Sequence, residues 1–435
     1  MATSVLPNIA IVGSGISGLA AAHALQGQAN ITLYEAASYF GGHTHTVDVS
    51  LPGAQGLVTH GVDTGFLVFN ERTYPHLIKL LADLNVETAK SDMSFSVQVP
   101  KAGGQSLEWS GASLSSVFVQ RKNLFSAKFL RMLRDILRFN RITTQMANSN
   151  AEAAMKQPLQ DFLTDQKFSN EFRDWYFLPM MGCIWSCPTD QMLQFPVATM
   201  IRFCYNHGLI QVTNRPQWWT VKGGAKHYVE KIIARIADKR LNTPVRQIVR
   251  DAAGVHVSTD RGTERFDKLV LATHSDQSLA MLQTPSQAEQ QVLSAIRYQP
   301  NRAVLHTDTS VLPQNKMAWA AWNYERAEQS SRESNTVCLH YLLNMLQPLP
   351  FAQSVLVSLN PINAIARQHI MAEFDYAHPV FDLAAVRAQG QVASLQGQQN
   401  THFCGAWMGY GFHEDGLKSG LQAAEHILSR PAVAR

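Results

Sequence analysis

The sequence predicts an α/β fold built on a parallel, nucleotide-binding sheet, and three observations lead to this prediction. A β-branched run, "NIAIV" (8–12), is followed by closely spaced glycines and then by an alanine- and leucine-rich stretch that favours a helix. A second apolar run, "ITLYEA" (31–36), follows that helix and ends in an acid. With 435 residues, 46% of them apolar, the chain can fill about two domains.

The glycine pattern G-x-G-x-x-G spans residues 13–18, between the first strand and the first helix. Gly13 permits a tight turn, Gly15 allows the backbone to approach a pyrophosphate, and Gly18 lets the helix pack closely on the strand. Free N–H groups at the start of the helix favour an anionic phosphate. We therefore expect a dinucleotide site rather than a purely structural turn, formed by Gly13, Ser14, Gly15, Ile16, Ser17 and Gly18.

An acid and a second glycine pair extend this site. Glu35, beside Ala36, ends the second strand 20 residues after Gly15, where a carboxylate accepts hydrogen bonds from a ribose. Its charge repels a 2′-phosphate, which disfavours an NADP-type ribose. Gly41 and Gly42 let backbone amides approach the same pyrophosphate from the other side.

Three stretches resemble FAD-binding proteins of the flavin-containing amine oxidase and phytoene desaturase superfamily. They are "SYFGGHTHTVDV" (38–49), "DKLVLATHS" (267–275) and "FCGAWMGYGFHEDGLKSGLQAAEHI" (403–427). The resemblance implies FAD as the cofactor. It also implies a Rossmann-type FAD-binding domain, of the glutathione-reductase-like, amine-oxidase branch, with an inserted α+β substrate domain.

The resemblance further implies that the FAD-binding domain is discontinuous. We expect it to comprise residues 1–75, 215–275 and 395–435, and the substrate domain to comprise 76–214 and 276–394.

The same resemblance assigns further residues to the cofactor. Val245 matches the position whose backbone holds the adenine, and the last glycine-rich turn opens a helix that faces the flavin ring. Many relatives have arginine after the double glycine, whereas this chain has His43, so a side-chain contact to the phosphate is not expected to be kept. The further residues are His43, Thr44, Gly65, Val245, Ala272, Thr273, Gly405, Asp415, Gly416 and Leu417.

Candidates for the reacting part of the site lie in "VDTGFLVFNERTYPHL" (62–77) and "AAWNY" (320–324). Relatives pass the chain close to the flavin ring where this sequence has Asp63, Thr64 and Gly65. Arg72 and Tyr74 are candidates to reach a substrate headgroup, with surface or packing roles as the alternative, and Trp322 is a pocket candidate. No lysine stands near Asn301 and Arg302, where amine oxidases of the superfamily keep one, so no catalytic side chain is assigned and a simple amine oxidase is disfavoured.

More narrowly, these two stretches and "GGHTHTVDV" (41–49) resemble a bacterial branch associated with cyclopropane-synthase-like enzymes and with methylated and furan-containing fatty acids. This implies an FAD-dependent desaturase or oxidase that acts on a lipid-like chain, such as a modified fatty acyl group. The alternatives are an isomerase of a lipid double bond, an amine oxidase, and a non-catalytic flavin-binding partner of a lipid-modifying enzyme.

Residues 125–141, "FSAKFLRMLRDILRFNR", predict an amphipathic helix. Seven Lys and Arg residues between Arg121 and Arg141 stand against one Asp, a net charge of +6. Such a helix suits an anionic membrane surface or a polar headgroup at the substrate entrance, and a core-packed helix with solvated arginines is the alternative. The apolar half of the wheel comprises Phe125, Phe129, Leu130, Met132, Leu133, Ile136, Leu137 and Phe139; the basic half comprises Lys128, Arg131, Arg134, Arg138 and Arg141.

Composition excludes several other classes. The net charge of +4 gives no general basic surface for nucleic acid, and no apolar stretch is long enough to span a bilayer. Five cysteines form no disulfide framework, so a cytoplasmic protein is expected, peripheral at the inner membrane face if the basic helix binds lipid.

Two residue pairs are spaced closely enough in the sequence to be candidate metal ligands. They are Cys183 with Cys187, and His43 with His45. No second cysteine pair completes a zinc pattern, so packing and loop hydrogen bonding are favoured and no metal site is expected. The apolar segment around Cys183 is expected to line a substrate pocket.

Overall fold

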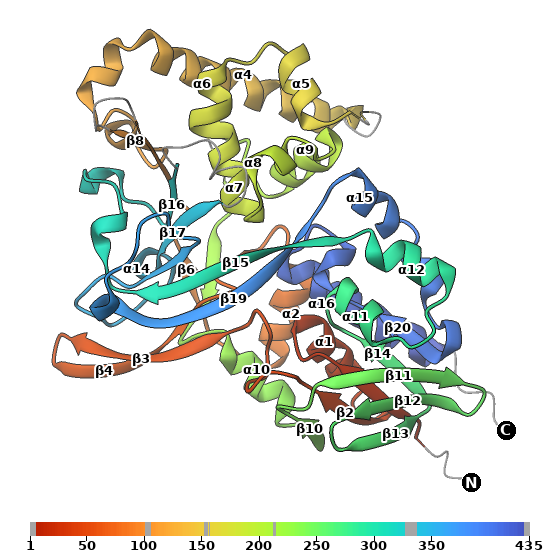
Figure 1. Cartoon of the computed structure of the whole chain (residues 1–435). Helices are drawn as coiled ribbons and strands as arrows, with labels where there is room; N and C mark the ends of the chain where they lie inside the picture. Colours follow the sequence, from red (N-terminus) through yellow and green to blue (C-terminus); the bar gives the residue numbers. More distant parts are fainter. Residues whose placement is uncertain are drawn as a thin grey trace.

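The computed structural model describes residues 6–100, 106–151, 155, 157–211, 215–326 and 337–429 (Figure 1). A five-stranded parallel sheet, in the order β10-β2-β1-β14-β20, confirms the α/β fold class. Its strands are drawn from three distant parts of the sequence. They are β1 (Asn8–Val12), β2 (Asn30–Tyr34), β10 (Asp238–Arg240), β14 (Lys268–Leu271) and β20 (Thr401–Phe403).

Both faces of this sheet are covered, as buried parallel strands require. Ile9 and Ile11 of β1 point into a core shared with helices, whereas Ala10 and Val12 point into a core shared with a small antiparallel sheet. The helices are α1 (Ile16–Ala24), α2 (Pro75–Asp83), α10 (Lys226–Ile233) and α16 (His413–Ser429). The small sheet is formed by β11 (Val245–Asp251), β12 (Gly254–Thr259) and β13 (Gly262–Phe266).

A mixed seven-stranded sheet forms the second half of the molecule, in the order β19-β15-β18-β17-β16-β7-β8. Its longest strands, β15 and β19, pair from Arg297 opposite Val380 to His306 opposite Ile370 and run between the two halves (Figure 1). The strands are β7 (Phe95–Pro100), β8 (Ser106–Ser110), β15 (Arg297–His306), β16 (Trp322–Glu325), β17 (Cys338–Leu342), β18 (Leu356–Leu359) and β19 (Ile370–Val380).

Helices cover this second sheet at the top of Figure 1. They share one large apolar core with it, to which Phe129, Phe177, Met181 and Leu339 contribute. The helices are α4 (Ala127–Ser149), α5 (Leu159–Asp165), α6 (Asn170–Phe172), α7 (Leu178–Trp185), α8 (Thr189–Met192) and α9 (Val197–Asn206), with a π-helical turn at Arg173–Phe177.

The remaining described elements connect these layers. They are the hairpin β3 (Thr46–Gly53) and β4 (Gly56–Asp63); the sheet β5 (Phe69–Asn70), β9 (Trp218–Val221) and β6 (Thr88–Ser91); the helices α3 (Leu114–Val117), α11 (Ser275–Met281), α12 (Gln287–Ser294), α14 (Leu343–Leu346) and α15 (Leu383–Gln389); and the 3₁₀ turns Arg121–Phe125, Thr309–Val311, Lys316–Ala318, Arg367–His369, Val392–Leu395, Gln398–Asn400 and Ala406–Met408.

Packing extends the nucleotide-binding half beyond the boundaries that the sequence suggested. Leu77, Leu80 and Leu81 of α2 lie in the same core as α1 and α10, although a boundary was expected after residue 75. Residues 279–296 and 385–395 likewise contribute to the core under β11 and β12. The apolar faces of these helices pack on the five-stranded sheet and on the small sheet beside it, and the division into two domains stays a prediction.

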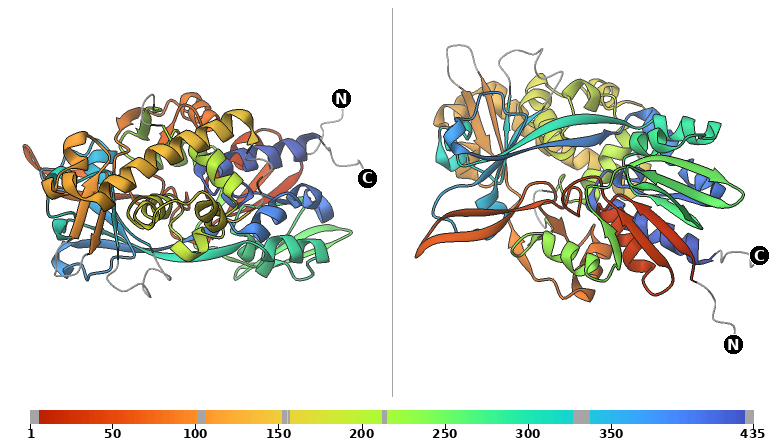
Figure 2. Two further views of the ribbon diagram at one scale, coloured as in Figure 1. Left: turned by 90° about the horizontal axis from the view of Figure 1, so that it is seen from above. Right: turned by 60° about the horizontal axis from the view of Figure 1, so that its bottom comes forward.

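The basic helix differs in detail from the wheel prediction. It begins at Ala127, because the Ser126 hydroxyl accepts a hydrogen bond from the Phe129 N–H and caps it, and this leaves Phe125 outside the helix. Phe129, Met132 and Phe139 are buried as expected, whereas Phe125, Leu130 and Leu137 are exposed. The core therefore covers less than half of the helix circumference. Figure 2 shows α4 lying across the outer side of the molecule.

In the described part of the chain, no helix combines the length and the apolar character needed to cross a membrane.

Candidate functional site

The turn between β1 and α1 has an open helix N-terminus. Gly13 has a φ of +99°, and a Cβ there would lie 2.8 Å from the Ala272 carbonyl oxygen. A Cβ on Gly18 would lie 2.0 Å from the Gly13 carbonyl oxygen, so both glycines are required for close packing. A Cβ on Gly15 would meet nothing within 4 Å, and no side chain caps α1. The first N–H groups of this helix thus face open space, as an anion site requires.

Ser14 links the acid and the double glycine to this turn. The Glu35 carboxylate accepts hydrogen bonds from the Ser14 N–H at 3.0 Å and the Ser14 hydroxyl at 2.5 Å. The Ser14 oxygen in turn accepts from the Gly41 N–H at 3.1 Å. A Cβ on Gly42 would lie 3.1 Å from the Gly15 Cα, so the second glycine loop lies directly against the first.

A cavity of about 410 Å³ opens beside these loops. Its volume lies in the range of small-molecule and cofactor sites. Thirteen of the residues predicted for the cofactor line it, and they come from six separate stretches of the chain. They are Gly13, Ser14, Gly15, Ile16, Ser17, Glu35, Gly41, Gly42, His43, Gly65, Ala272, Thr273 and Gly405.

The other predicted cofactor residues do not line the cavity, and their assignment to the cofactor stays a prediction. Asp415 accepts hydrogen bonds from the N–H groups of Tyr410 and Phe412, both at 3.0 Å, and so shapes the loop before α16. A Cβ on Gly416 would lie 2.8 Å from Ile16, so this glycine serves helix packing, and Leu417 is buried in the core. The start of α16 reaches the cavity through residues 410–413 instead.

Four more predicted residues are placed elsewhere. Gly18 packs on Gly13, Ala36 is exposed, and Val245 lies in the core under β11. The Thr44 hydroxyl bonds to Tyr228, whose own hydroxyl contacts His413 Nε2 at 2.7 Å. Thr44 therefore supports the cavity wall from behind.

Asp63 and Thr64 do not line the described cavity, and both are held by hydrogen bonds within the protein. Asp63 is 1% exposed and accepts hydrogen bonds from the Ala225 N–H, at 2.9 Å, and from the Gln347 amide, at 2.6 Å. Burial raises the pKa of Asp63 to about 6. The Thr64 hydroxyl lies 2.8 Å from the Tyr376 hydroxyl. Both residues fix the loop that presents Gly65 to the cavity.

Arg72, Tyr74 and Trp322 are the remaining candidates for the reacting part of the site, and two of them line the cavity. Tyr74 is 3% exposed and Trp322 is half-buried, and both contribute to the cavity wall. Arg72 is exposed and lies over the ring of Tyr205, 5.1 Å from its centroid. It does not reach the cavity, so the surface alternative holds for Arg72.

Three histidines that no sequence motif singled out lie close to the glycine loops. His274, His378 and His413 line the cavity together with His43. Burial, followed by repulsion from neighbouring imidazoles, lowers the pKa of His43 and His274 to about 4 and that of His378 and His413 to about 3. At neutral pH these rings are uncharged, and they supply hydrogen-bonding groups without charge.

His378 is held in one tautomer by a residue from the neighbouring strand. Asn301 Nδ2 donates to His378 Nδ1 at 2.8 Å, because the Asn301 oxygen already accepts from Asn360. The proton of His378 therefore lies on Nε2. Asn301 thus orients this imidazole from the neighbouring strand β15.

The opposite wall of the cavity is apolar and aromatic. The segment around Cys183, within "MMGCIWSCPT" (180–189), lines it, and that this wall binds the substrate stays a prediction. Cys183 and Cys187 are both buried in the large core. Among the described lining residues, Glu35 is the one Asp, Glu, Lys or Arg. The apolar wall includes Met93, Ile184, Trp185, Phe203, Leu209, Trp218, Trp322, Tyr341, Phe381 and Phe412.

The geometry fits a flavin dinucleotide. The uncapped start of α1 and the open face of Gly15 form a cradle for a pyrophosphate, with Glu35 at the ribose position. His43 Nε2 is buried and has no hydrogen-bond partner within the protein, so the cavity presents a polar atom that a ligand can satisfy. Because His43 is neutral, it replaces the arginine of relatives without its charge. The fold and this cavity define an FAD-binding flavoprotein.

Comparison with known proteins gives the family. The sequence profile of the flavin containing amine oxidoreductases matches residues 16–348, and the chain belongs to this family. It is an FAD-dependent oxidoreductase. Among curated proteins, no sequence matches this chain.

Solved structures share the fold over nearly the whole chain. Cyclohexylamine oxidase from Brevibacterium oxydans is 18% identical, with a TM-score of 0.69 over 98% of this chain and 100% of that chain. A fatty acid isomerase from P. acnes that produces CLA is 16% identical, with a TM-score of 0.67 over 97% and 98%. A putative protoporphyrinogen oxidase from Exiguobacterium is 16% identical, with a TM-score of 0.64 over 98% and 99%.

Proposed function

We propose that this oxidoreductase acts on an apolar, lipid-like substrate, a modified fatty acyl chain, and leaves a double bond in it. The observation that carries the proposal is the cavity wall opposite the glycine loops, which is built from aromatic, aliphatic and methionine side chains. Glu35, the charged lining residue, is already hydrogen-bonded to Ser14 and Ala37 at the nucleotide end. A substrate ammonium would therefore meet no carboxylate in the apolar part of the described cavity. The fold shared with a fatty acid isomerase supports the same substrate class.

FAD supplies an acceptor for the hydride that leaves the substrate. The protein binds and orients the acyl chain through the apolar wall and excludes water from it. His378 holds its proton on Nε2 and, with a pKa lowered to about 3 by burial, stays a neutral hydrogen-bond donor at the cavity surface. Burial also lowers the pKa of His43 and His274 to about 4, so these two imidazoles are uncharged at neutral pH before the substrate binds.

Anaerobic mixing of the FAD-loaded protein with branched or methylated fatty acyl substrates tests the proposal. We expect loss of the yellow flavin absorbance together with a product two hydrogens lighter by mass spectrometry. A product of unchanged mass would contradict the proposal and would favour an isomerase of a lipid double bond. Bleaching by alkyl amines alone would replace it by an amine oxidase. A flavin that no lipid reduces would point to a non-catalytic partner of a lipid-modifying enzyme.

We also propose that an anionic bilayer supplies the substrate, through a surface formed by residues 114–141. Nine large apolar residues of the described chain are strongly exposed, and five of them lie on this surface. Isolated exposed apolar residues are normal, but a gathered group marks an interaction site. The five are Leu114 (81% exposed), Leu124 (41%), Phe125 (90%), Leu130 (44%) and Leu137 (61%).

The charge of this surface favours an anionic lipid bilayer as its binding partner. Seven Lys and Arg residues lie between Arg121 and Arg141, whereas Asp135, the acid among them, is 1% exposed and accepts from the Ser169 N–H. Its carboxylate lies 3.5 Å from Arg134, and Glu171 lies 3.6 Å from Arg131. Apolar side chains framed by cations suit the interface of an anionic lipid bilayer.

We expect the Lys128→Glu, Arg134→Glu, Arg141→Glu variant to lose binding to phosphatidylglycerol vesicles by at least about 10-fold, since each basic residue near an anionic surface contributes roughly 1 kcal/mol. Co-sedimentation at low and high salt measures the effect, with phosphatidylcholine vesicles as reference. A matched control reverses Lys90, Arg235 and Arg261, which are exposed outside this surface. Equal sedimentation of the two triple variants would exclude the membrane surface, as would wild-type binding that is independent of lipid charge.

A further inference from the structure

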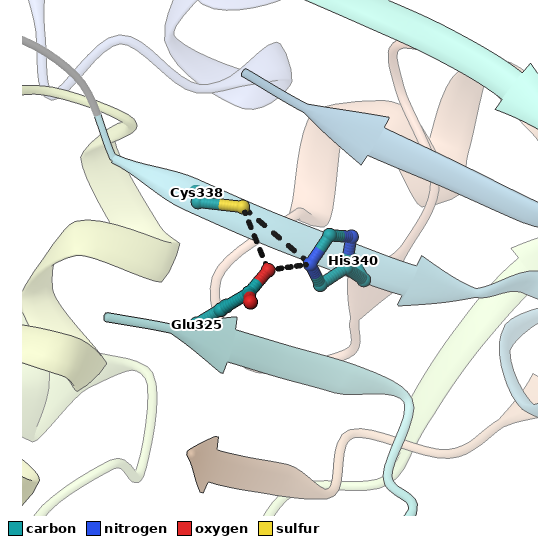
Figure 3. Close-up of side chains that lie close together, drawn as sticks. All are labelled: Glu325, Cys338 and His340. Atoms are coloured by element: carbon teal, nitrogen blue, oxygen red, sulfur yellow. Dashed lines mark hydrogen bonds and ion pairs between the residues drawn. The ribbon is translucent and has the colours of Figure 1, made fainter. Parts of the chain in front are cut away.

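Glu325, Cys338 and His340 come together on two neighbouring strands of the seven-stranded sheet (Figure 3). Glu325 of β16 lies directly opposite Cys338 of the antiparallel β17. His340 is two residues further along β17, so it shares a sheet face with Cys338. Cys338 is 3% exposed, His340 is fully buried, and the Glu325 side chain is 16% exposed. The mechanism proposed above makes no use of this cluster.

The three potential ligand atoms have the mutual spacing of a tetrahedral metal site. His340 Nε2 lies 3.0 Å from Glu325 Oε2 and 3.4 Å from Cys338 Sγ. Cys338 Sγ lies 3.7 Å from the same Glu325 oxygen. Zinc bonds of roughly 2.0 to 2.3 Å at tetrahedral angles put such ligand atoms about 3.3 to 3.6 Å apart. One ion therefore fits between the three atoms with small adjustments.

A second layer of hydrogen bonds orients the ligands. The Asp308 N–H donates to His306 Nδ1 at 3.1 Å, so His306 carries its proton on Nε2 and donates it to the Ser358 oxygen at 2.7 Å. The same oxygen lies 2.6 Å from His340 Nδ1 and has a second lone pair to accept the Nδ1 proton. His340 then presents the lone pair of Nε2 toward Glu325 and Cys338. Metal-binding histidines generally carry such a partner on the other ring nitrogen.

We propose that Cys338 Sγ, His340 Nε2 and Glu325 Oε2 bind one Zn²⁺ ion, with water in the fourth position. A thiolate, an imidazole and a carboxylate together suit zinc, whereas magnesium and calcium prefer oxygen ligands alone. On binding, the Cys338 thiol releases its proton to solvent as the Zn–S bond forms, and no oxidation state changes.

The position of the cluster indicates a structural role. Trp322 and Tyr341 lie opposite each other on the same two strands, with ring centroids 5.0 Å apart, and both line the cavity. Side chains alternate between the faces of a strand, so Glu325 and Cys338 lie on the face opposite these two rings. The ion joins β16 to β17 directly behind the cavity wall.

The zinc content of the FAD-loaded protein tests this assignment without any substrate. After incubation with Zn²⁺ and gel filtration, we expect about one zinc per chain by mass spectrometry. Replacement by Co²⁺ is expected to give a thiolate-to-cobalt absorption band. The Cys338→Ser and His340→Gln variants should each bind Zn²⁺ at least about 10-fold more weakly, and Cys338→Ser should lose the cobalt band.

Cys204→Ser is the matched control, because Cys204 is equally buried but lies in the helical core. It should keep both the zinc and the band. Retained FAD in each variant identifies folded protein, and Glu325→Gln replaces any variant that does not fold. Absence of zinc from the wild type, or equal zinc in the wild type and the ligand variants, would overturn the proposal in favour of a metal-free hydrogen-bonded cluster.

Discussion

A Gly15→Asp variant is expected to be folded but colourless. A Cβ at Gly15 would meet no protein atom within 4 Å, so we expect the apoprotein to fold with a side chain at this position. The same side chain projects into the space at the uncapped start of α1, where the pyrophosphate of FAD would lie. Two unit charges about 4 Å apart repel by roughly 4 kcal/mol at an effective dielectric constant of 20, which exceeds a 100-fold loss of affinity.

The ratio of flavin to protein absorbance, followed by titration of the apoprotein with FAD, measures this loss. Gly111→Asp is the matched control: this glycine also faces open space, but in an exposed turn remote from the cavity. The unfolding temperatures of the two apoproteins should agree. A yellow Gly15→Asp protein with one FAD per chain would refute the placement of the pyrophosphate at α1.

The second large effect is expected from Ile184→Asp, which separates a lipid from an amine as substrate. Ile184 is half-buried and lines the apolar wall, at the edge of the large core against which it packs. Filling the cavity with an acyl chain would remove water from the new carboxylate, at a cost of several kcal/mol. For a lipid substrate kcat/KM should fall at least about 100-fold with the flavin retained.

An ammonium substrate would respond in the opposite direction, because the new carboxylate would attract it. Steady-state rates with paired fatty acyl and alkyl amine substrates therefore decide between the two substrate classes. Ile184→Leu keeps the apolar surface and should change kcat/KM by less than about 10-fold. If Ile184→Asp left the rate with lipid substrates unchanged, the apolar wall would not be part of the substrate site.

The parts of the site that depend on local sequence were predictable. Gly13, Gly15 and Gly18 are fixed by the turn between one strand and one helix, and a sequence pattern is sufficient to find them. Glu35 and the Gly41–Gly42 pair follow within the same short unit. Their mutual contacts require no knowledge of the rest of the chain.

The other parts depend on contacts between distant segments. His378 reaches the cavity because β19 pairs with β15, which also places Asn301 beside it. Asp415 was expected at the flavin, but the preceding loop folds back over it and takes both of its hydrogen bonds. The pairing of Glu325 with Cys338 likewise has no signal in the sequence spacing.

The β15–β19 ladder restricts how the protein admits its substrate. Tyr298, near one end, lines the cavity beside the nucleotide-binding half, whereas Ala303 and Leu305 belong to the core of the other half. Both strands continue from one half into the other, so separating the two halves would have to bend this hydrogen-bonded ribbon.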